Sequence, residues 1–269
     1  MTTATRRRSQ PAPLLSLDDA RAQMLDGVEA GPIETLPLDA ALGRVLAVAI
    51  ESRLTLPPWD NSAMDGFAVR ASDIVGASEQ RPATLAVIGE SAAGRSTKVE
   101  VEMGTAVRIL TGAAMPRGAD TVVPVEDTDA PMGAADLPPH VQILASRPPG
   151  AHIRRVGSDL RMGYPLLALG TYLAPAALAV AAAGGHATVD VHRAPRVAIL
   201  ATGDELVEVG ATLKADQIPD SNSVGLGAQA KESGAEVRPL GIAPDNLADV
   251  VDRLRVGLAW ADVVVVSGG

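Results

Sequence analysis

The chain has 269 residues, of which 47% are apolar but only 2% aromatic, and its formal net charge at pH 7 is −9. This apolar content is enough for one large or two ordinary domains with buried cores. So few aromatic rings argue against binding single-stranded nucleic acid by base stacking, and the acidic balance argues against a phosphate-backbone binder, which needs a basic face. A small anionic ligand in a locally basic pocket remains compatible with this composition.

Cysteine is absent, which excludes disulfides, zinc sites built from thiolates and a cysteine nucleophile. None of the histidines has the i, i+4 or short-loop spacing of a metal site; they are His140, His152, His186 and His192. Any metal must therefore be held by oxygen ligands, which indicates magnesium-like chemistry. An intracellular, cytoplasmic location fits this composition.

Neither the N-terminal region nor the most apolar stretch indicates a membrane. Residues 1–13 contain arginines and prolines without an apolar run, so we expect a flexible tail and no secretory signal. The most membrane-like stretch, Tyr164–Gly185, is interrupted by Pro165, Gly170 and Pro175. Because a spanning helix needs about 20 consecutive apolar residues, we predict buried soluble structure here and no membrane partner.

The first helix is predicted to begin at Ser16, whose side chain can cap it, with Asp18 and Asp19 near the positive end of the helix dipole. Gly31-Pro32 then ends it. Apolar residues at helical spacing give the helix one apolar face, made of Leu17, Ala20, Met24, Leu25 and Val28.

Short β-like runs follow, separated by Gly- and Pro-containing turns such as residues 115–120. Many short strands with turns between them favour a small barrel or sandwich over about residues 55–150. The predicted strands are Glu34–Leu38, Val45–Glu51, Phe67–Arg70, Ala83–Ile88, Ala106–Leu110 and Thr121–Glu126.

The pattern changes after Arg193 to longer apolar strands that alternate with helices. Strand, helix, strand, helix and strand within one short region predict a right-handed parallel α/β unit, with Gly234 ending the first helix. These elements are predicted at Arg196–Ala201, Ser223–Ser233, Glu236–Ile242, Asp245–Trp260 and Asp262–Val266.

We therefore predict a multi-domain chain of the α/β plus β-rich class. Residues 1–13 are predicted to be a tail. Residues 14–54 and 151–185 together form a domain that holds the first helix and links the other two domains. A β-barrel-like domain at 55–150 is inserted into it. A parallel three-layer α/β domain occupies 186–269. It is expected to be incomplete, because a strand entering Ser-Gly-Gly normally leads into a phosphate-binding turn and a further helix.

Ligands of parallel α/β sheets bind beyond the carboxyl ends of the strands. Three such ends are visible, at residues 202–205, 241–245 and 267–269, and we expect them to converge in space. They supply carboxylates for a hard cation and glycines that let backbone N–H groups approach an anion. The alternative is that Asp204 and Asp245 are only helix or turn caps.

Three further loops combine charged and turn-forming residues: 57–70, with two carboxylates; 108–113, a strand that ends in a hydroxyl and a glycine; and 150–159, with two adjacent arginines. The arginines form a plausible anion clamp in an acidic protein. Asx-turn chemistry explains the first loop, and a solvated basic turn the third, without any ligand. Residue types alone therefore indicate an α/β protein that binds a phosphorylated anion with magnesium.

The motif DNSAMDGFAVR at 60–70 resembles the signature of the molybdopterin molybdenumtransferases, the family of the bacterial MoeA proteins and the gephyrin E domain. Six further motifs occur in the order and spacing of that family, and together they cover the chain from about Leu15 to its end. They are RILTGA at 108–113, IRRVGSD at 153–159, ATGDEL at 201–206, DSN at 220–222, GIAPDN at 241–246 and VVVVSGG at 263–269.

The resemblance implies that adenylylated molybdopterin and molybdate react, with Mg²⁺, to give molybdenum cofactor and AMP, and that 186–269 is the molybdopterin-binding domain. Its matching motifs imply catalytic roles for Asp65, Thr111 and Glu205, and metal binding by Asp65 and Asp245. The substrate-binding residues that it implies are Asn61, Ser62, Arg154, Asp159, Thr202, Gly203, Asp245, Ser267, Gly268 and Gly269. The thiolates that bind molybdenum belong to the pterin, so the absence of cysteine is no obstacle.

The resemblance also implies a homodimer, with supply of substrate by a molybdopterin adenylyltransferase and delivery to molybdoenzyme recipients. The chain departs from the family at Phe67, where many relatives carry Tyr, and at its end, where the family continues into further loops and a small β-domain. We therefore expect little or no activity from the 269 residues alone. A non-catalytic pterin-binding or scaffolding module, or a nucleotide hydrolase sharing only the α/β domain, are the alternatives.

Overall fold

The computed structural model describes residues 15–131 and 136–268. Internal contacts divide the chain into two compact units. The first, called the β-rich unit below, comprises residues 35–191, and the second, called the α/β unit, comprises the residues up to 34 and from 192 onward. The finer division into a tail, a linking domain, an insert and an α/β domain stays a prediction.

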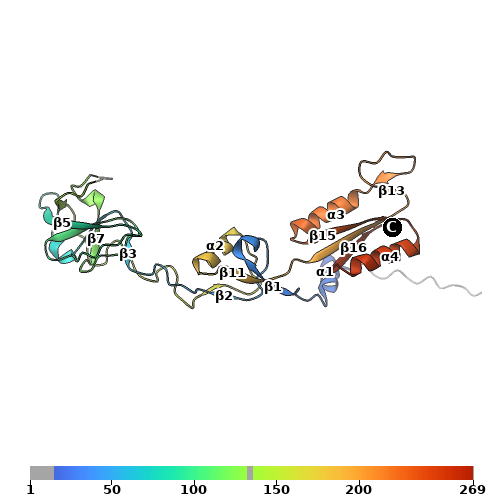
Figure 1. Ribbon diagram of the computed structural model, residues 1–269, viewed down its shortest axis with the longest axis horizontal. Coiled ribbons are helices and arrows are strands. Elements are labelled where there is room, and N and C mark those ends of the chain that lie inside the picture. The colour runs from blue at the N-terminus through green and yellow to red at the C-terminus, as the bar shows by residue number, and fades with distance from the viewer. Residues whose placement is uncertain (1–14, 132–135, 269) are drawn as a thin grey trace, which may run out of the picture. The chain divides into compact units, whose positions relative to one another are not determined.

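A curled five-stranded sheet, in the order β7-β4-β6-β5-β8, forms the core of the β-rich unit (Figure 1). β4 is antiparallel to β6 and β7, β5 runs parallel to β6, and β8 closes the other side antiparallel to β5. A bridge between Thr128 and Ile143 connects the region after β7 to β8, which confirms the barrel-like prediction. The strands are β4 (Gly66–Val69), β5 (Ala83–Ser91), β6 (Thr105–Ile109), β7 (Thr121–Pro124) and β8 (His140–Ile143).

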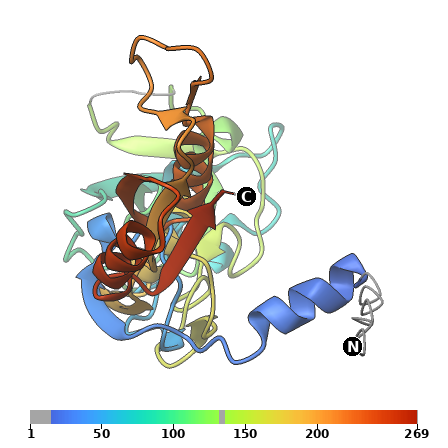
Figure 2. The same cartoon turned by 90° about the vertical axis from the view of Figure 1, so that its right-hand side faces the viewer.

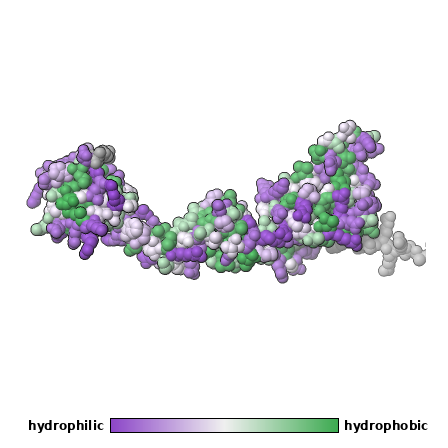
Figure 3. Space-filling view, viewed as in Figure 1, coloured by the Kyte–Doolittle hydropathy of each residue, from purple (hydrophilic) through white to green (hydrophobic). Residues whose placement is uncertain are grey.

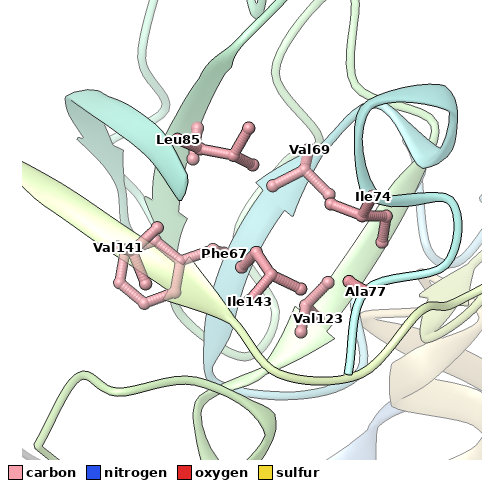
Figure 4. Close-up of a cluster of buried hydrophobic side chains, with 9 residues drawn as sticks. Phe67, Val69, Ile74, Ala77, Leu85, Val123, Val141 and Ile143 are labelled. Atoms are coloured by element: carbon pink, nitrogen blue, oxygen red, sulfur yellow. The ribbon is translucent and has the colours of Figure 1, made fainter. Parts of the chain in front are cut away.

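The interior of this sheet is a cluster of apolar side chains around Phe67, which is 1% exposed (Figure 4). Val69, Ile74 and Val123 pack beside it, and Leu85, Val141 and Ile143 come from the strands across the barrel. Every residue of β4 is buried, so the strand that directly follows Asp65 is held from both sides. The loop before β4 therefore starts from a rigid base.

A second apolar cluster, which includes Leu46, Leu173 and Val191, lies among short strands and one helix. The predicted strand over Val45–Glu51 is wrong in its first half. Only β2, at Ile50–Glu51, is a strand, because Val45 and Leu46 bridge to two different partners and build no continuous ladder. The remaining elements are β1 (Ile33–Pro37), η1 (Leu38–Ala40), β3 (Asn61–Ser62), η2 (Ala71–Ile74), η3 (Val125–Asp127), β9 (Ile153–Arg154), β10 (Pro165–Leu167), α2 (Pro175–Ala183) and β11 (Thr188–His192).

The stretch 164–185 forms β10 and the nine-residue helix α2. In the part of the chain that the structure describes, no helix is both long enough and apolar enough to cross a membrane.

The α/β unit contains the predicted parallel sheet, in the order β15-β12-β16 (Figures 1 and 2). Gly227 of α3 lies against Ile199 and Val237, whereas Gly257 of α4 lies against Ala198 and Val264. Ile199 and Ala198 are consecutive in β12 and point to opposite faces, so the two helices cover opposite faces and make three layers. The elements are β12 (Arg196–Thr202), α3 (Ser221–Glu232), β15 (Glu236–Ala243), α4 (Leu247–Leu258) and β16 (Val263–Ser267).

Two features of the α/β unit differ from the prediction. The first helix, α1 (Leu17–Leu25), is capped by Ser16 as predicted but ends well before Gly31. It ends at Asp26, whose backbone is extended and whose carboxylate is unfavourable at the negative end of the helix dipole. None of its residues is buried. The chain between β12 and α3 also makes an unforeseen excursion with two short parallel strands, β13 (Leu206–Val207) and β14 (Ile218–Pro219), seen in orange in Figure 2.

Exposed apolar side chains are scattered over both units. The view in Figure 3 shows apolar and polar residues intermixed on each. On the excursion, Val209, Leu213 and Ile218 are all at least half exposed.

Candidate functional site

The DNSAMDG loop, residues 60–66, is fixed at both ends by strands. β3 pairs with β9, so Asn61 lies opposite Arg154, and β4 begins at Gly66. Between them, the Ser62 hydroxyl donates to the Met64 carbonyl at 2.6 Å and accepts from the Met64 N–H at 3.2 Å, which closes a tight turn. A Cβ at Gly66 would lie 2.0 Å from the Val123 carbonyl oxygen, so only glycine fits there.

Asp65, at the end of this loop, bonds to Thr111 at the end of β6. Its Oδ1 accepts from the Thr111 backbone N–H at 2.7 Å and from the Thr111 hydroxyl at 2.8 Å. These two bonds, the backbone one first, hold the pKa of Asp65 below its ordinary value, so it is a carboxylate at neutral pH. While its hydroxyl donates to Asp65, Thr111 cannot donate the same hydrogen to an oxyanion. An anion at this site would then need other donors, such as the half-exposed guanidinium of Arg154.

The arginine loop, residues 153–159, separates its two arginines. Arg154 pairs with Asp159, and the Ser158 hydroxyl also donates to Asp159 at 3.1 Å. Both partners of the Arg154–Asp159 pair are about half exposed, so the pair is accessible to a ligand. Arg155 instead pairs with Asp60, which means that the two arginines do not form the joint clamp predicted from their adjacency.

Asn61 is 5% exposed, and its side-chain oxygen has no hydrogen-bond partner among the residues that the structure describes. It lies opposite Arg154 in the β3–β9 pair, and its substrate-binding role stays a prediction. Ser62, the other expected residue of β3, is fully buried and uses its hydroxyl in the turn, so its side chain serves the shape of the loop.

A cavity of about 490 Å³ opens beside Asp65 in the β-rich unit. Its walls are mainly apolar and include Phe67, Leu110 and Leu137. Arg108 also lines it and pairs with Glu90. Asp65 therefore borders a mainly apolar cavity while it is bonded to Thr111.

The three strand ends of the α/β unit converge as predicted. The Gly203 N–H donates to the Ala243 carbonyl at 3.2 Å, and the Asp245 N–H donates to Asp204 Oδ1 at 3.0 Å, which joins the ends of β12 and β15. At the end of β16, a Cβ on Gly268 would lie 2.0 Å from the Thr202 hydroxyl oxygen. The Asp204 carboxylate thus fixes the turn that carries Asp245, whereas the cap of α4 is Asn246.

A cavity of about 660 Å³ lies at these ends, lined by Thr202, Glu205, Ser267 and Gly268 among others. Asn222, in the first turn of α3, also lines it and donates to the Ser267 hydroxyl at 2.8 Å. The cavity lining does not include Asp245, and Gly269 lies outside the described residues.

Sequence reasoning assigned no role to Asn222 or Asp60. Both stand inside matched motifs, which was the available signal, but their partners lie 45 and 95 residues away in the chain. Asp60 Oδ2 accepts from Arg155 at 2.6 Å and Oδ1 from the Val156 N–H at 2.8 Å. These bonds, that with the Val156 backbone first, lower the pKa of Asp60.

Within residues 15–131 and 136–268, no group of three or more His, Asp or Glu side chains is arranged to hold a metal ion. Asp65 and Asp245, the expected metal ligands, belong to different units. Their joint role stays a prediction, as do the catalytic roles of Asp65, Thr111 and Glu205.

Comparison with known proteins decides the family. The description "MoeA N-terminal region (domain I and II)" matches residues 15–185, and "Probable molybdopterin binding domain" matches residues 198–269. The chain belongs to the MoeA family. The two matched regions contain the site residues of the β-rich unit and of the α/β unit, respectively.

Curated members of the MoeA family include proteins named molybdopterin molybdenumtransferase. That of Nostoc is 42% identical over 236 residues, which are 88% of this chain and 53% of the relative. That of Haemophilus influenzae is 38% identical over 262 residues, 95% of this chain and 61% of the relative. A crystal structure of the MoeA protein of Pyrococcus horikoshii matches with a TM-score of 0.85 at 32% identity, covering 96% of this chain and 67% of that one. The chain thus spans little more than half the length of the curated relatives.

Proposed function

We propose that the protein takes part in molybdenum cofactor biosynthesis by inserting molybdate into adenylylated molybdopterin, with Mg²⁺, and releasing AMP and molybdenum cofactor. One observation carries the proposal: the carboxylate of the DNSAMDG loop, Asp65, is exposed and is held ionised by Thr111. This arrangement stands in a chain whose relatives are named molybdopterin molybdenumtransferases.

In this proposal the β-rich unit binds molybdate. A tetrahedral oxyanion needs N–H or guanidinium donors, and Arg154 supplies a guanidinium that is half exposed. Arg154 is already paired with Asp159, so an incoming oxyanion competes with that carboxylate. Asp65 keeps its charge and its position through both bonds from Thr111.

The α/β unit binds the pterin in this proposal. Thr202, Ser267 and Asn222 present polar groups into one cavity, and Glu205 contributes a carboxylate. Gly203 and Gly268 keep the converging strand ends closely packed, because a side chain at either position would collide with a neighbour.

Magnesium is proposed to neutralise the charge that develops on the pyrophosphate group during its cleavage. Mg²⁺ is usually held by one or two carboxylates together with waters and substrate phosphates, so a site that lacks a cluster of three protein carboxylates is compatible with it. Asp65 and Asp245 offer the hard oxygen donors that this ion prefers.

The partners are also part of the proposal: a second copy of the chain, the molybdopterin adenylyltransferase that supplies the substrate, and the molybdoenzymes that receive the product, all in the cytoplasm. The exposed apolar residues of α1, among them Leu17 and Met24, support an interface with another chain.

The test uses the product of the complete gene and measures AMP released from adenylylated molybdopterin in the presence of molybdate. Asp65→Asn keeps an acceptor for Thr111 but removes the charge, and we expect the rate to fall by about 100-fold or more. Asp73→Asn is the control, because Asp73 also accepts a backbone N–H, that of Gly104 at 3.0 Å, in the same unit.

Unchanged activity of Asp65→Asn would remove the catalytic role of Asp65. If that variant and the unaltered protein both bound molybdopterin but released no AMP, the scaffolding alternative would be favoured. The enzyme hypothesis is favoured over the scaffolding alternative because the chain carries the matching motif residues Asp65, Thr111, Glu205 and Asp245.

A further inference from the structure

We propose that Asp60 is a positioning residue that holds the arginine loop against the DNSAMDG loop and thereby sets the affinity of Arg154 for an oxyanion. The proposal rests on the proposed function, because it takes the oxyanion to be molybdate. Asp60 does not touch the ligand in this account; it acts through Arg155 and Val156.

The two chain segments that carry these loops are paired at two places. At one end, Leu56 and Leu160 form a bridge whose N–H···O distances are 2.8 and 3.0 Å. At the other end, Asn61 lies opposite Arg154 in the β3–β9 pair. Between these pairs, residues 57–60 and 155–159 belong to no strand or bridge.

The Asp60 carboxylate connects the two segments across this stretch. It accepts from the Val156 N–H at 2.8 Å with one oxygen and from the Arg155 guanidinium at 2.6 Å with the other. Two backbone bonds assist it, from the Gly157 N–H to the Pro57 carbonyl at 2.9 Å and from the Asp159 N–H to the Leu56 carbonyl at 3.0 Å. Asp60 itself is anchored, because its carbonyl accepts from the Met115 N–H at 3.0 Å.

These contacts determine what the neighbouring arginine can do. Because Arg155 is bound to Asp60, its guanidinium takes no part in the Arg154–Asp159 pair. Of the two arginines in the loop, Arg154 is then the one that can release the carboxylate of Asp159 and bind an oxyanion in its place. Its backbone is held on one side by Asn61 and on the other by the bonded residues Arg155 and Val156. Such positioning favours tight binding because less freedom is lost when the ligand arrives.

A carboxylate suits this position better than a neutral side chain. It must accept from two donors that approach different oxygens, and one of these donors is cationic. The carboxylate is partly buried, with 33% of its side chain exposed, so water competes only partly with the two bonds. Asparagine would keep the bond to Val156 and lose the ion pair, and alanine would lose both.

The experiment compares Asp60→Ala and Asp60→Asn with Asp127→Ala in the product of the complete gene. Asp127→Ala is a matched control, since Asp127 pairs with Arg147 in the same unit and is similarly half-buried. Hydrogen exchange of the Val156 amide measures the contact, and the molybdate KM and kcat for AMP release measure its consequence.

For Asp60→Ala we expect Val156 to exchange about tenfold faster or more and the molybdate KM to rise by about tenfold or more, with kcat within about threefold of the unaltered protein. Asp60→Asn should raise KM by a smaller factor, because it restores the acceptor for Val156. Asp127→Ala should change neither quantity. If Asp60→Ala does not fold, Asp60→Asn and Arg155→Ala decide the question, each expected to raise KM while leaving kcat nearly unchanged.

An unchanged KM in Asp60→Ala, an equal rise in Asp127→Ala, or a loss confined to kcat would overturn the proposal. If the unaltered protein released no AMP with molybdate, the proposed function would fail instead. Val156 exchange and direct titration of the protein with molybdate would then decide the role of Asp60: faster exchange together with weaker binding in Asp60→Ala supports it, and no change in either overturns it.

Discussion

Replacing Gly66 by alanine should destabilise the β-rich unit strongly, because the added Cβ would lie 2.0 Å from the Val123 carbonyl oxygen. Ordinary contact begins at 3.4 Å, so the two backbones must separate by about 3.4 − 2.0 = 1.4 Å. The added Cβ is fixed to the backbone of β4 and meets backbone atoms of its paired strand β7, so no rotamer relieves the clash. Both strands are fully buried, so the whole sheet must adjust.

Overpacking of this kind costs about 3 kcal/mol, and for a unit of this size that corresponds to a fall in Tm of about 6–12 °C. The assay is urea and thermal unfolding of the 269-residue chain, with hydrogen exchange of β4 and β7 amides to assign the transition. Gly89→Ala in β5 is the control, since the nearest atoms to its Cβ would belong to the Val99 and Thr97 side chains, at ordinary contact distances of 3.5 and 3.8 Å. A Gly66→Ala chain as stable as Gly89→Ala would refute the reasoning.

Three further predictions address the ionised carboxylates and the second core. Thr111→Val removes one of two bonds to Asp65, so the pKa of Asp65 should rise toward its ordinary value; an unchanged NMR titration would contradict this. Asp262 has its pKa lowered chiefly by Arg193, so its stabilising effect is present above about pH 4 and is lost as pH falls through the folded pKa. Asp262→Asn should therefore be less stable than the unaltered chain at pH 7, with a difference that shrinks below about pH 4; a constant difference in urea unfolding would refute this. Leu173→Ala, at a fully buried position, should cost about 2–5 kcal/mol in the same unfolding assay, and a cost under about 1 kcal/mol would show that the site is not tightly packed.

The α/β unit could be predicted closely because its elements carry strong local signals. β12 contains the continuous apolar run VAILA at 197–201, and α4 has a capping Asn246 and an apolar stripe. The observed bounds of these elements therefore differ from the predicted ones by one or two residues. The excursion with β13 and β14 could not be predicted, since each strand has two residues and exists only through its pairing.

The strands of the β-rich unit were harder to predict, because several of them are also short and depend on pairing with distant segments. β8 reads His-Val-Gln-Ile, which alternates polar and apolar residues but over only four positions, and it becomes a strand by pairing with β5. Val45 and Leu46 are β-branched or apolar and suggested a strand, yet they bridge to partners more than 120 residues away that belong to different segments. The periodicity of apolar residues along the sequence cannot predict pairing between segments that are so far apart.

The candidate site shows the same limit at the level of side chains. The motifs identified Asp65, Thr111 and Arg154, and the structure adds how they are bonded. Because Arg154 and Arg155 are adjacent in the sequence, they were predicted to act together, whereas in the structure Arg155 forms an ion pair with Asp60. That assignment depends on a contact across 95 residues, which no local pattern contains.

The most direct test of the central claim is to measure AMP and molybdenum cofactor formed in the same reaction by the product of the complete gene, with and without molybdate. Insertion coupled to cleavage predicts equal amounts of the two products and no AMP release when molybdate is omitted. AMP release that does not depend on molybdate would show a nucleotide hydrolase and contradict the account.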